Sequence, residues 1–276
     1  VVYAAWLLLR PHRAPTADPE ADSRAWQLVR RYGRGTLDYF ALRDDKTRFI
    51  SGSTVVAYSV RHGIALVSPD PIGPSDERSR AWRAFQDYAA SRGWSTAVLA
   101  ASEEWLPIYD GAGMFSIYAG DEAVVDVTRF TLEGGRNKHL RQAAARVERA
   151  GYTVSLHRSA EIDEQTAREL RALMGQSRKG DVERGYSMTL SRLFDPRDDD
   201  LLLAVARDGD GRPAAFCQFV PAPGIGGYSL DLMRRADGDL GRARPPGLPS
   251  ACARRGASSM GEPQPRPGTV APGHSA

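Results

Sequence analysis

The sequence predicts an α/β fold with mixed sheets, built as two similar units in tandem. Short β-branched and aliphatic runs alternate with stretches in which apolar residues recur at helical spacing. The second unit reads as helix, strand, helix and then three successive strands, which favours a mixed sheet covered by helices over an all-parallel sheet. Neither GxGxxG after a strand nor GxxxxGK[ST] occurs, so these two nucleotide phosphate loops are excluded.

The first unit is expected to begin at residues 38–51. A helix is expected at residues 76–92, with Ser75 as its N-cap, because Ala81, Trp82 and Phe85 recur on one face. A short helix should start at Ser102 and stop before Gly111. Three prolines exclude regular structure at residues 68–74. Strands are expected at residues 53–60, 63–68, 96–101 and 122–130.

The second unit repeats this alternation of helices and strands. Helices are expected at residues 137–150, ended by Gly151, and at residues 161–174. The run Asp208-Gly209-Asp210-Gly211 is typical of a hairpin turn and should join two strands. Strands are expected at residues 152–156, 201–206, 214–220 and 228–233.

Both ends of the chain differ in composition from the middle. Residues 1–13 hold nine apolar residues followed by a basic run, which predicts the end of a transmembrane helix with its basic flank in the cytoplasm. A short buried helix or strand is the alternative. Residues 14–25 read as a polar linker. Residues 236–276 are rich in Pro, Gly, Ala and Arg and read either as a disordered tail or as the product of a slipped reading frame.

Overall composition excludes several classes of protein. Two cysteines are too few for a disulfide scaffold or a four-cysteine zinc site, and the five histidines are scattered. The net charge of +3 does not by itself indicate nucleic-acid binding. Nearly all of the positive charge is arginine, which fits either a GC-rich coding sequence or recognition of phosphate by bidentate donors.

The densest basic stretch lies on the predicted helix at residues 137–150 and just before it. It is either a solvated helix or a surface that follows the phosphates of tRNA or of an anionic lipid. Its candidate binding residues are Arg136, Lys138, Arg141 and Arg146.

Two further segments carry candidate polar residues. The Gly-broken stretch at residues 178–187 holds Glu183 and Ser187, and it is either a functional loop or a plain surface loop. In the strand at residues 228–233, alternation places Asp231 on the face opposite Leu230 and Leu232. Aspartate is disfavoured inside strands, so we expect Asp231 either to pair with an arginine or to line a cleft. Arg234 lies three residues further on, so both side chains reach one site only if the strand bulges or ends between them.

In their order along the chain, four segments resemble the soluble region of phosphatidylglycerol lysyltransferases of the multiple-peptide-resistance-factor type, in an actinobacterial version. The segments are residues 70–73, 140–152, 183–187 and 228–234. The resemblance covers residues 26–235. It implies two tandem acetyltransferase-like (GNAT) domains, at residues 26–125 and 126–235, placed after a membrane domain. The family continues past residue 235 with further strands and helices, so the second domain is expected to be incomplete.

The resemblance also implies a chemistry. An aminoacyl group, lysyl in the first instance, would pass from aminoacyl-tRNA to a glycerol hydroxyl of phosphatidylglycerol at the cell membrane, with this region on the cytoplasmic side and no cofactor. Asp231 is then expected to bind the substrate ammonium or take the proton, Arg234 to bind a phosphate and Glu183 to bind the lysine side chain. Alternatives are an aminoacyl-tRNA-dependent peptidoglycan transferase and a membrane-associated binding module without activity.

Overall fold

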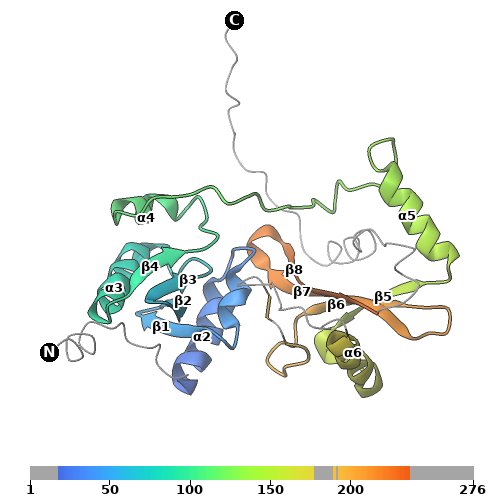
Figure 1. The fold of residues 1–276 in the computed structure, drawn as a ribbon, viewed down its shortest axis with the longest axis horizontal. Helices are drawn as coiled ribbons and strands as arrows, with labels where there is room; N and C mark the ends of the chain where they lie inside the picture. The colour runs from blue at the N-terminus through green and yellow to red at the C-terminus, as the bar shows by residue number, and fades with distance from the viewer. Residues whose placement is uncertain (1–17, 177–188, 191, 237–276) are drawn as a thin grey trace, which may run out of the picture.

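Two four-stranded sheets, one in each half of the chain, form the framework of the computed structural model (Figure 1). The structure describes residues 18–176, 189–190 and 192–236. Residues 1–13, residues 14–17 of the expected linker and nearly all of the expected tail therefore lie outside the described residues, as do Glu183 and Ser187.

The first half holds a mixed sheet of order β1-β2-β3-β4, in which β3 and β4 are parallel and the other neighbours antiparallel. Along β2, Val55 and Ala57 face one hydrophobic cluster while Val56 and Tyr58 face another, as the period of two in a strand requires. Its elements are α2 (Pro19–Tyr32), η1 (Asp38–Leu42), β1 (Thr47–Ser51), β2 (Thr54–Arg61), β3 (Ile64–Val67), η2 (Ser75–Glu77), α3 (Arg78–Ser91), β4 (Ser95–Val98) and α4 (Leu106–Gly111).

Helix α2 covers one face of this sheet and α3 covers the other. Val55 and Ala57 share a cluster with Leu28 and Val29 of α2. The expected linker is therefore wrong from Pro19 onward. The Asp18 side chain accepts a hydrogen bond from the Glu20 amide (3.0 Å) and proline occupies the first turn, which together begin the helix.

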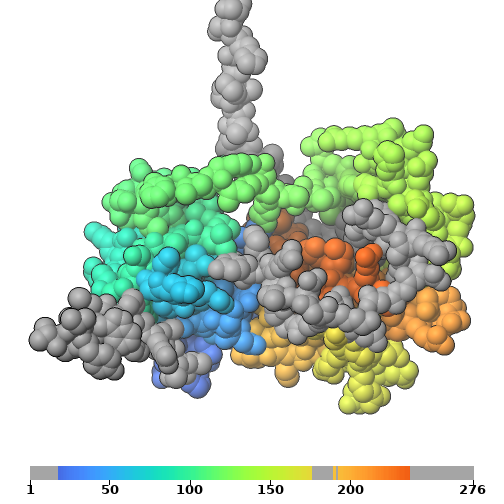
Figure 2. Space-filling view, viewed as in Figure 1, coloured from blue at the N-terminus to red at the C-terminus, as the bar shows by residue number. Residues whose placement is uncertain are grey.

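Several expectations for the first half differ from the structure. Ser75 opens the 3-10 turn η2 and does not cap α3, which begins at Arg78. Helix α4 begins at Leu106, after a turn at residues 103–105. Residues 122–130 form no strand, although their β-branched pattern predicts one. A strand needs a neighbour to pair with, and this segment instead runs exposed across the surface, with Val124 64% exposed (Figure 2).

The second half holds a sheet of order β5-β6-β7-β8, and the three successive strands expected at its end are confirmed. The expected mixed sheet is wrong for this half, because all of its neighbouring strands are antiparallel. The expected hairpin turn is also confirmed, because the Asp208 amide donates to the Arg212 carbonyl (2.9 Å). Helix α6 packs Leu170 and Leu173 against Leu203 and Phe216 of the sheet. The elements are α5 (Lys138–Arg149), β5 (Thr153–Arg158), η3 (Ser159–Glu161), α6 (Glu164–Gln176), β6 (Leu202–Arg207), β7 (Pro213–Ala222), η4 (Pro223–Ile225) and β8 (Gly227–Arg235).

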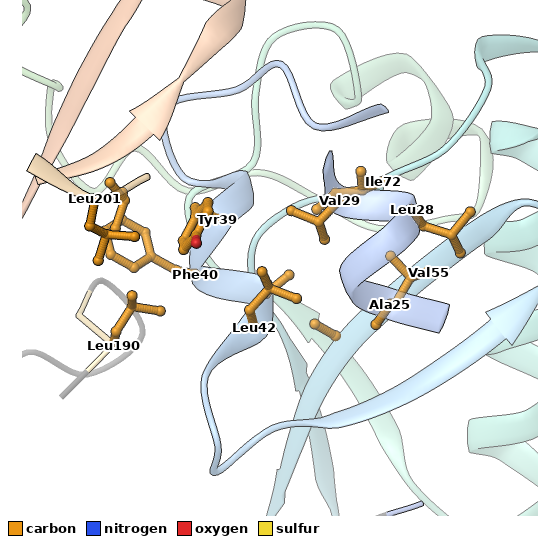
Figure 3. Close-up of a cluster of buried hydrophobic side chains, with 13 residues drawn as sticks. Ala25, Leu28, Val29, Tyr39, Phe40, Leu42, Val55, Ile72, Leu190 and Leu201 are labelled. Atoms are coloured by element: carbon orange, nitrogen blue, oxygen red, sulfur yellow. The ribbon is translucent and has the colours of Figure 1, made fainter. Parts of the chain in front are cut away.

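A third hydrophobic cluster, which we call the junction core, joins the two halves (Figure 3). It packs buried side chains of α2, η1 and the first sheet against Leu190, Leu201 and Val220 of the second half. The backbones also approach closely, since a Cβ added at Gly224 would lie 2.0 Å from the carbonyl oxygen of Arg34. Only glycine fits there without displacing the first half.

Truncating a buried leucine of the second sheet should be far more costly than truncating an exposed one. Leu203 is fully buried and Leu230 is 49% exposed. We expect Leu203→Ala to lower the free energy of unfolding by about 2–5 kcal/mol, because it removes buried methyl groups and leaves a cavity. Leu230→Ala should lower it by less than about 1 kcal/mol. Urea unfolding of both variants checks this, and equal losses would contradict the placement of α6 on this face.

Candidate functional site

Strand β8 carries both Asp231 and Arg234, and it bulges at Asp231. In the register with β7, Gln218 lies opposite Leu232 and Phe219 lies opposite Leu230, which leaves Asp231 as the extra residue. Asp231 and Leu232 are consequently both buried, whereas Leu230 is exposed. The expectation that Asp231 faces away from both leucines is therefore wrong for Leu232, because a bulge breaks the alternation of faces.

The bulge also changes the relation between Asp231 and Arg234. Arg234 lies two residues beyond Leu232 and so shares its face of the strand, the side on which Asp231 is buried. The condition for both side chains to serve one site, a bulged strand, is met. Arg234 is half-buried and its guanidinium donates to the Met233 carbonyl (3.0 Å).

The Asp231 carboxylate binds the segment at residues 189–190, which precedes β6. Oδ1 accepts from the Leu190 amide (2.6 Å) and Oδ2 accepts from Nε2 of Gln218 (2.6 Å). The Thr189 hydroxyl is a further partner. Burial raises the pKa of Asp231, while the hydrogen bonds from Gln218, Leu190 and Thr189 oppose this shift, as does the positive charge of Arg192.

The basic residues that the sequence predicts for substrate binding lie near β5, at the opposite edge of the second sheet from Asp231. Arg136, Lys138, Arg141 and Arg146 are all exposed on or beside α5, which leads into β5. Strands β5 and β8 are opposite edges of the sheet, about 14 Å apart at the usual strand spacing. The Arg141 guanidinium donates to the carbonyls of Leu132 (2.5 Å) and Gly134 (3.0 Å), so it holds the turn before the helix.

Sequence reasoning missed three residues around Asp231. Gln218 is an isolated polar residue inside an apolar strand, a pattern that could have identified it as a partner for a buried polar group. Arg43 and Arg192 carry no such signal, because both lie in irregular segments. The Arg43 guanidinium donates to the Thr189 carbonyl (2.5 Å) and the Arg192 carbonyl accepts from Gln218 (3.0 Å).

A pocket of about 560 Å³ opens at the junction of the halves, between α2 and residues 196–199. Trp26 lines it, and each of its charged groups is in an ion pair, as Arg30 is with Asp199 (2.7 Å). None of the candidate residues predicted from the sequence lines this pocket.

Two features are absent from residues 18–176, 189–190 and 192–236. Within these ranges, no group of three or more His, Cys, Asp or Glu side chains is arranged to hold a metal ion. None of the helices that the structure describes has the length and apolar character needed to cross a membrane.

The sequence matches known proteins over most of its length. Residues 26–241 match the family described as phosphatidylglycerol lysyltransferase, C-terminal. The lysylphosphatidylglycerol biosynthesis bifunctional protein LysX of Rhodococcus opacus is 39% identical over 229 residues, which are 82% of this chain and 20% of that protein. LysX of Mycobacterium avium is 37% identical over 240 residues, or 86% of this chain and 20% of that protein. The chain thus spans about a fifth of the length of these relatives.

Two solved structures share the fold. L-PGS from Bacillus licheniformis superposes with a TM-score of 0.75 at 22% identity, covering 89% of this chain and 75% of that one. The C-terminal domain of a putative lysylphosphatidylglycerol synthetase from Agrobacterium fabrum gives a TM-score of 0.75 at 23% identity, covering 88% and 76%. Together with the sequence matches, these structures place both sheets within one known architecture.

The buried Lys46 of the first half should make stability depend on pH. Its ammonium donates to the Ser68 carbonyl, and burial, reinforced by the charge of Arg43, lowers its pKa from 10.5 to about 7. Between these values the unfolded chain binds one proton more than the folded chain, so stability rises with pH. From pH 7 to pH 10 we expect a rise of about 3–4 kcal/mol that Lys46→Met removes.

Urea unfolding at pH 7, 8, 9 and 10 measures this effect as the difference between the wild type and the variant. Lys138→Met is the matched control, because Lys138 is exposed on α5. The same pH dependence in wild type and Lys46→Met would show that Lys46 titrates normally.

Proposed function

The chain belongs to the family of phosphatidylglycerol lysyltransferase C-terminal regions, and on that premise we propose that it transfers an aminoacyl group, lysyl in the first instance, from aminoacyl-tRNA to phosphatidylglycerol. The product is a lipid that carries an additional positive charge. The observation that carries this proposal is that the family match spans both sheets and includes the bulged strand with Asp231 and Arg234.

The proposed reaction is a transesterification. A glycerol hydroxyl of the lipid attacks the ester carbonyl at the 3′ end of the tRNA, and the bond from that carbonyl to the ribose oxygen breaks. The hydroxyl proton ends on the ribose oxygen, so no oxidant or cofactor is needed. Such a reaction requires positioning, a proton acceptor and stabilisation of charge on the carbonyl oxygen.

Asp231 is the carboxylate that we propose for the substrate ammonium or for the proton. An ionised carboxylate offers about four acceptor positions. Leu190, Gln218 and Thr189 use three of them, which leaves capacity for one more donor. Burial raises the pKa of Asp231, which brings it nearer to that of a useful general base.

The remaining roles are proposals from the family resemblance. Arg234 binds a phosphate, Glu183 the lysine side chain, and Ser187 contributes to substrate binding. The exposed cations of α5 attract the phosphates of tRNA or of the lipid.

The same resemblance supports a proposed context for the chain. The two halves correspond to tandem acetyltransferase-like domains at residues 26–125 and 126–235. They work at the cell membrane, on its cytoplasmic side.

Transfer itself can be measured with the purified chain, lysyl-tRNA labelled in its lysine and vesicles containing phosphatidylglycerol. We expect the wild type to form a labelled lipid and Asp231→Ala to form it at least about 100-fold more slowly, because the acceptor for the ammonium or proton is lost. Thin-layer chromatography of extracted lipids measures the product. Asp210→Ala is the control, because Asp210 is an exposed aspartate in the β6–β7 turn.

Unchanged transfer by Asp231→Ala would refute the assignment of Asp231. A wild-type chain that forms no lipid product with any aminoacyl-tRNA would refute the activity and favour a binding module. A labelled peptidoglycan precursor in place of a lipid would instead identify a peptidoglycan transferase.

Binding of tRNA should depend on salt through α5. We expect Lys138→Gln combined with Arg146→Gln to weaken tRNA binding. The plot of log K for binding against log[salt] should become less steep by about 1.4 to 1.8, since each phosphate contact contributes about 0.7 to 0.9 to the steepness. Filter binding at several salt concentrations measures the slope. Arg61→Gln combined with Arg83→Gln removes two exposed arginines from the first half of the molecule and should leave it unchanged. Equal slopes in wild type and the α5 variant would exclude this helix from the tRNA interface.

A further inference from the structure

A continuous set of hydrogen bonds leads from Asp231 to Arg192. The amide of Gln218 donates from Nε2 both to Oδ2 of Asp231 (2.6 Å) and to the Arg192 carbonyl (3.0 Å). Because both of these neighbours are acceptors, the orientation of the Gln218 amide is set by them. Gln218 is 1% exposed, so water does not compete for these bonds. Asp231 is therefore connected to the backbone of residue 192 as well as to that of Leu190.

The Arg192 side chain continues this connection into the first half of the molecule. Nη1 donates to the Leu42 carbonyl (2.8 Å) and to Oδ1 of Asp44 (2.9 Å). Nε and Nη2 donate to the two carboxylate oxygens of Asp198 (2.8 and 3.3 Å). One guanidinium thus holds the C-terminal end of η1 and the segment that follows Leu190 in the second half.

The partners of Arg192 are themselves fixed. The Asp198 side chain is 2% exposed, and the Tyr39 hydroxyl of η1 donates to it (3.0 Å). Arg43 donates to the Thr189 carbonyl (2.5 Å), directly before the amide that binds Asp231. The segment around residues 189–198 is consequently attached to η1 and the residues after it at three positions.

We infer that Arg192 is a positioning residue, which fixes Asp231 relative to the first half of the molecule without touching the substrate. The inference rests on the proposed function in so far as Asp231 acts in transfer. Catalytic groups must be held within about 0.5 Å of their productive positions, and residues that lock them serve this purpose. A lysine cannot replace Arg192. The contacts of Arg192 use all three nitrogens of its planar guanidinium, whereas a lysine ammonium has a single nitrogen.

The test is Arg192→Lys, alone and combined with Asp231→Ala. Arg197→Lys is the matched control, because Arg197 lies in the same segment but pairs with Asp195 beside it (2.7 Å). We expect Arg192→Lys to accelerate hydrogen exchange of the Leu190 amide about tenfold and to lower kcat about tenfold, since charge-assisted bonds are lost. The KM for lysyl-tRNA should stay within about twofold if ground-state binding is untouched.

The double variant separates positioning from general packing. If Arg192 acts through Asp231, then Arg192→Lys changes kcat and Leu190 exchange by less than about twofold in the Asp231→Ala background. An equally large effect in that background, or an unchanged Leu190 amide in Arg192→Lys, overturns the inference.

Two further measurements keep the test decisive. If Arg192→Lys does not fold, Asp44→Ala removes one cross-half partner from the surface, where the Asp44 side chain is 68% exposed, and should accelerate Leu190 exchange in the same direction. An unchanged amide in this variant counts against the inference. If the wild type transfers no aminoacyl group, the proposed function fails, and the exchange measurements alone still decide whether Arg192 positions Asp231.

Discussion

Burial of η1 between the two halves is the constraint on which the arrangement of the molecule depends. Tyr39, Phe40 and Leu42 are at most 5% exposed, and they pack in one core with Leu190 and Leu201 of the second half. Each sheet also has a core of its own, so the junction core is what relates the sheets to each other. Burial of apolar area, at about 25 cal/mol per Å², supplies the energy for this contact.

The polar contacts of the candidate site are arranged around this apolar junction. Arg43 follows η1 directly, and Arg192 reaches back to the last carbonyl of η1 at Leu42. In so buried a place unpaired polar groups are costly, so the carboxylates and guanidiniums must satisfy one another. The same bonds that compensate burial also hold the chain against Asp231. Stability of the junction and geometry of the candidate site are thus properties of one set of residues.

Sequence patterns predicted β6, β7 and β8 well because these three strands are neighbours along the chain. Consecutive antiparallel strands joined by turns need only local signals, and the Asp208 turn supplies one. Residues 122–130 have a strand pattern too, yet pattern alone cannot say whether a pairing partner is present. Asp231 was identifiable as an unusual residue in a strand, and Arg234 as part of a segment that resembles the family. Arg192 was not, because its partners at Leu42 and Asp44 lie about 150 positions away in the sequence.

The sequence by itself determined the α/β class, the family and the choice of Asp231 and Arg234, because composition, periodicity and motif order are properties of neighbouring residues. Only the tertiary structure decided that β8 bulges at Asp231, that Gln218 and Leu190 bind its carboxylate, and that η1 lies in a core shared by both halves. The physical reason is the same in each case. A bulge, a buried hydrogen bond and a shared core each depend on which distant segments meet, and no local pattern records that.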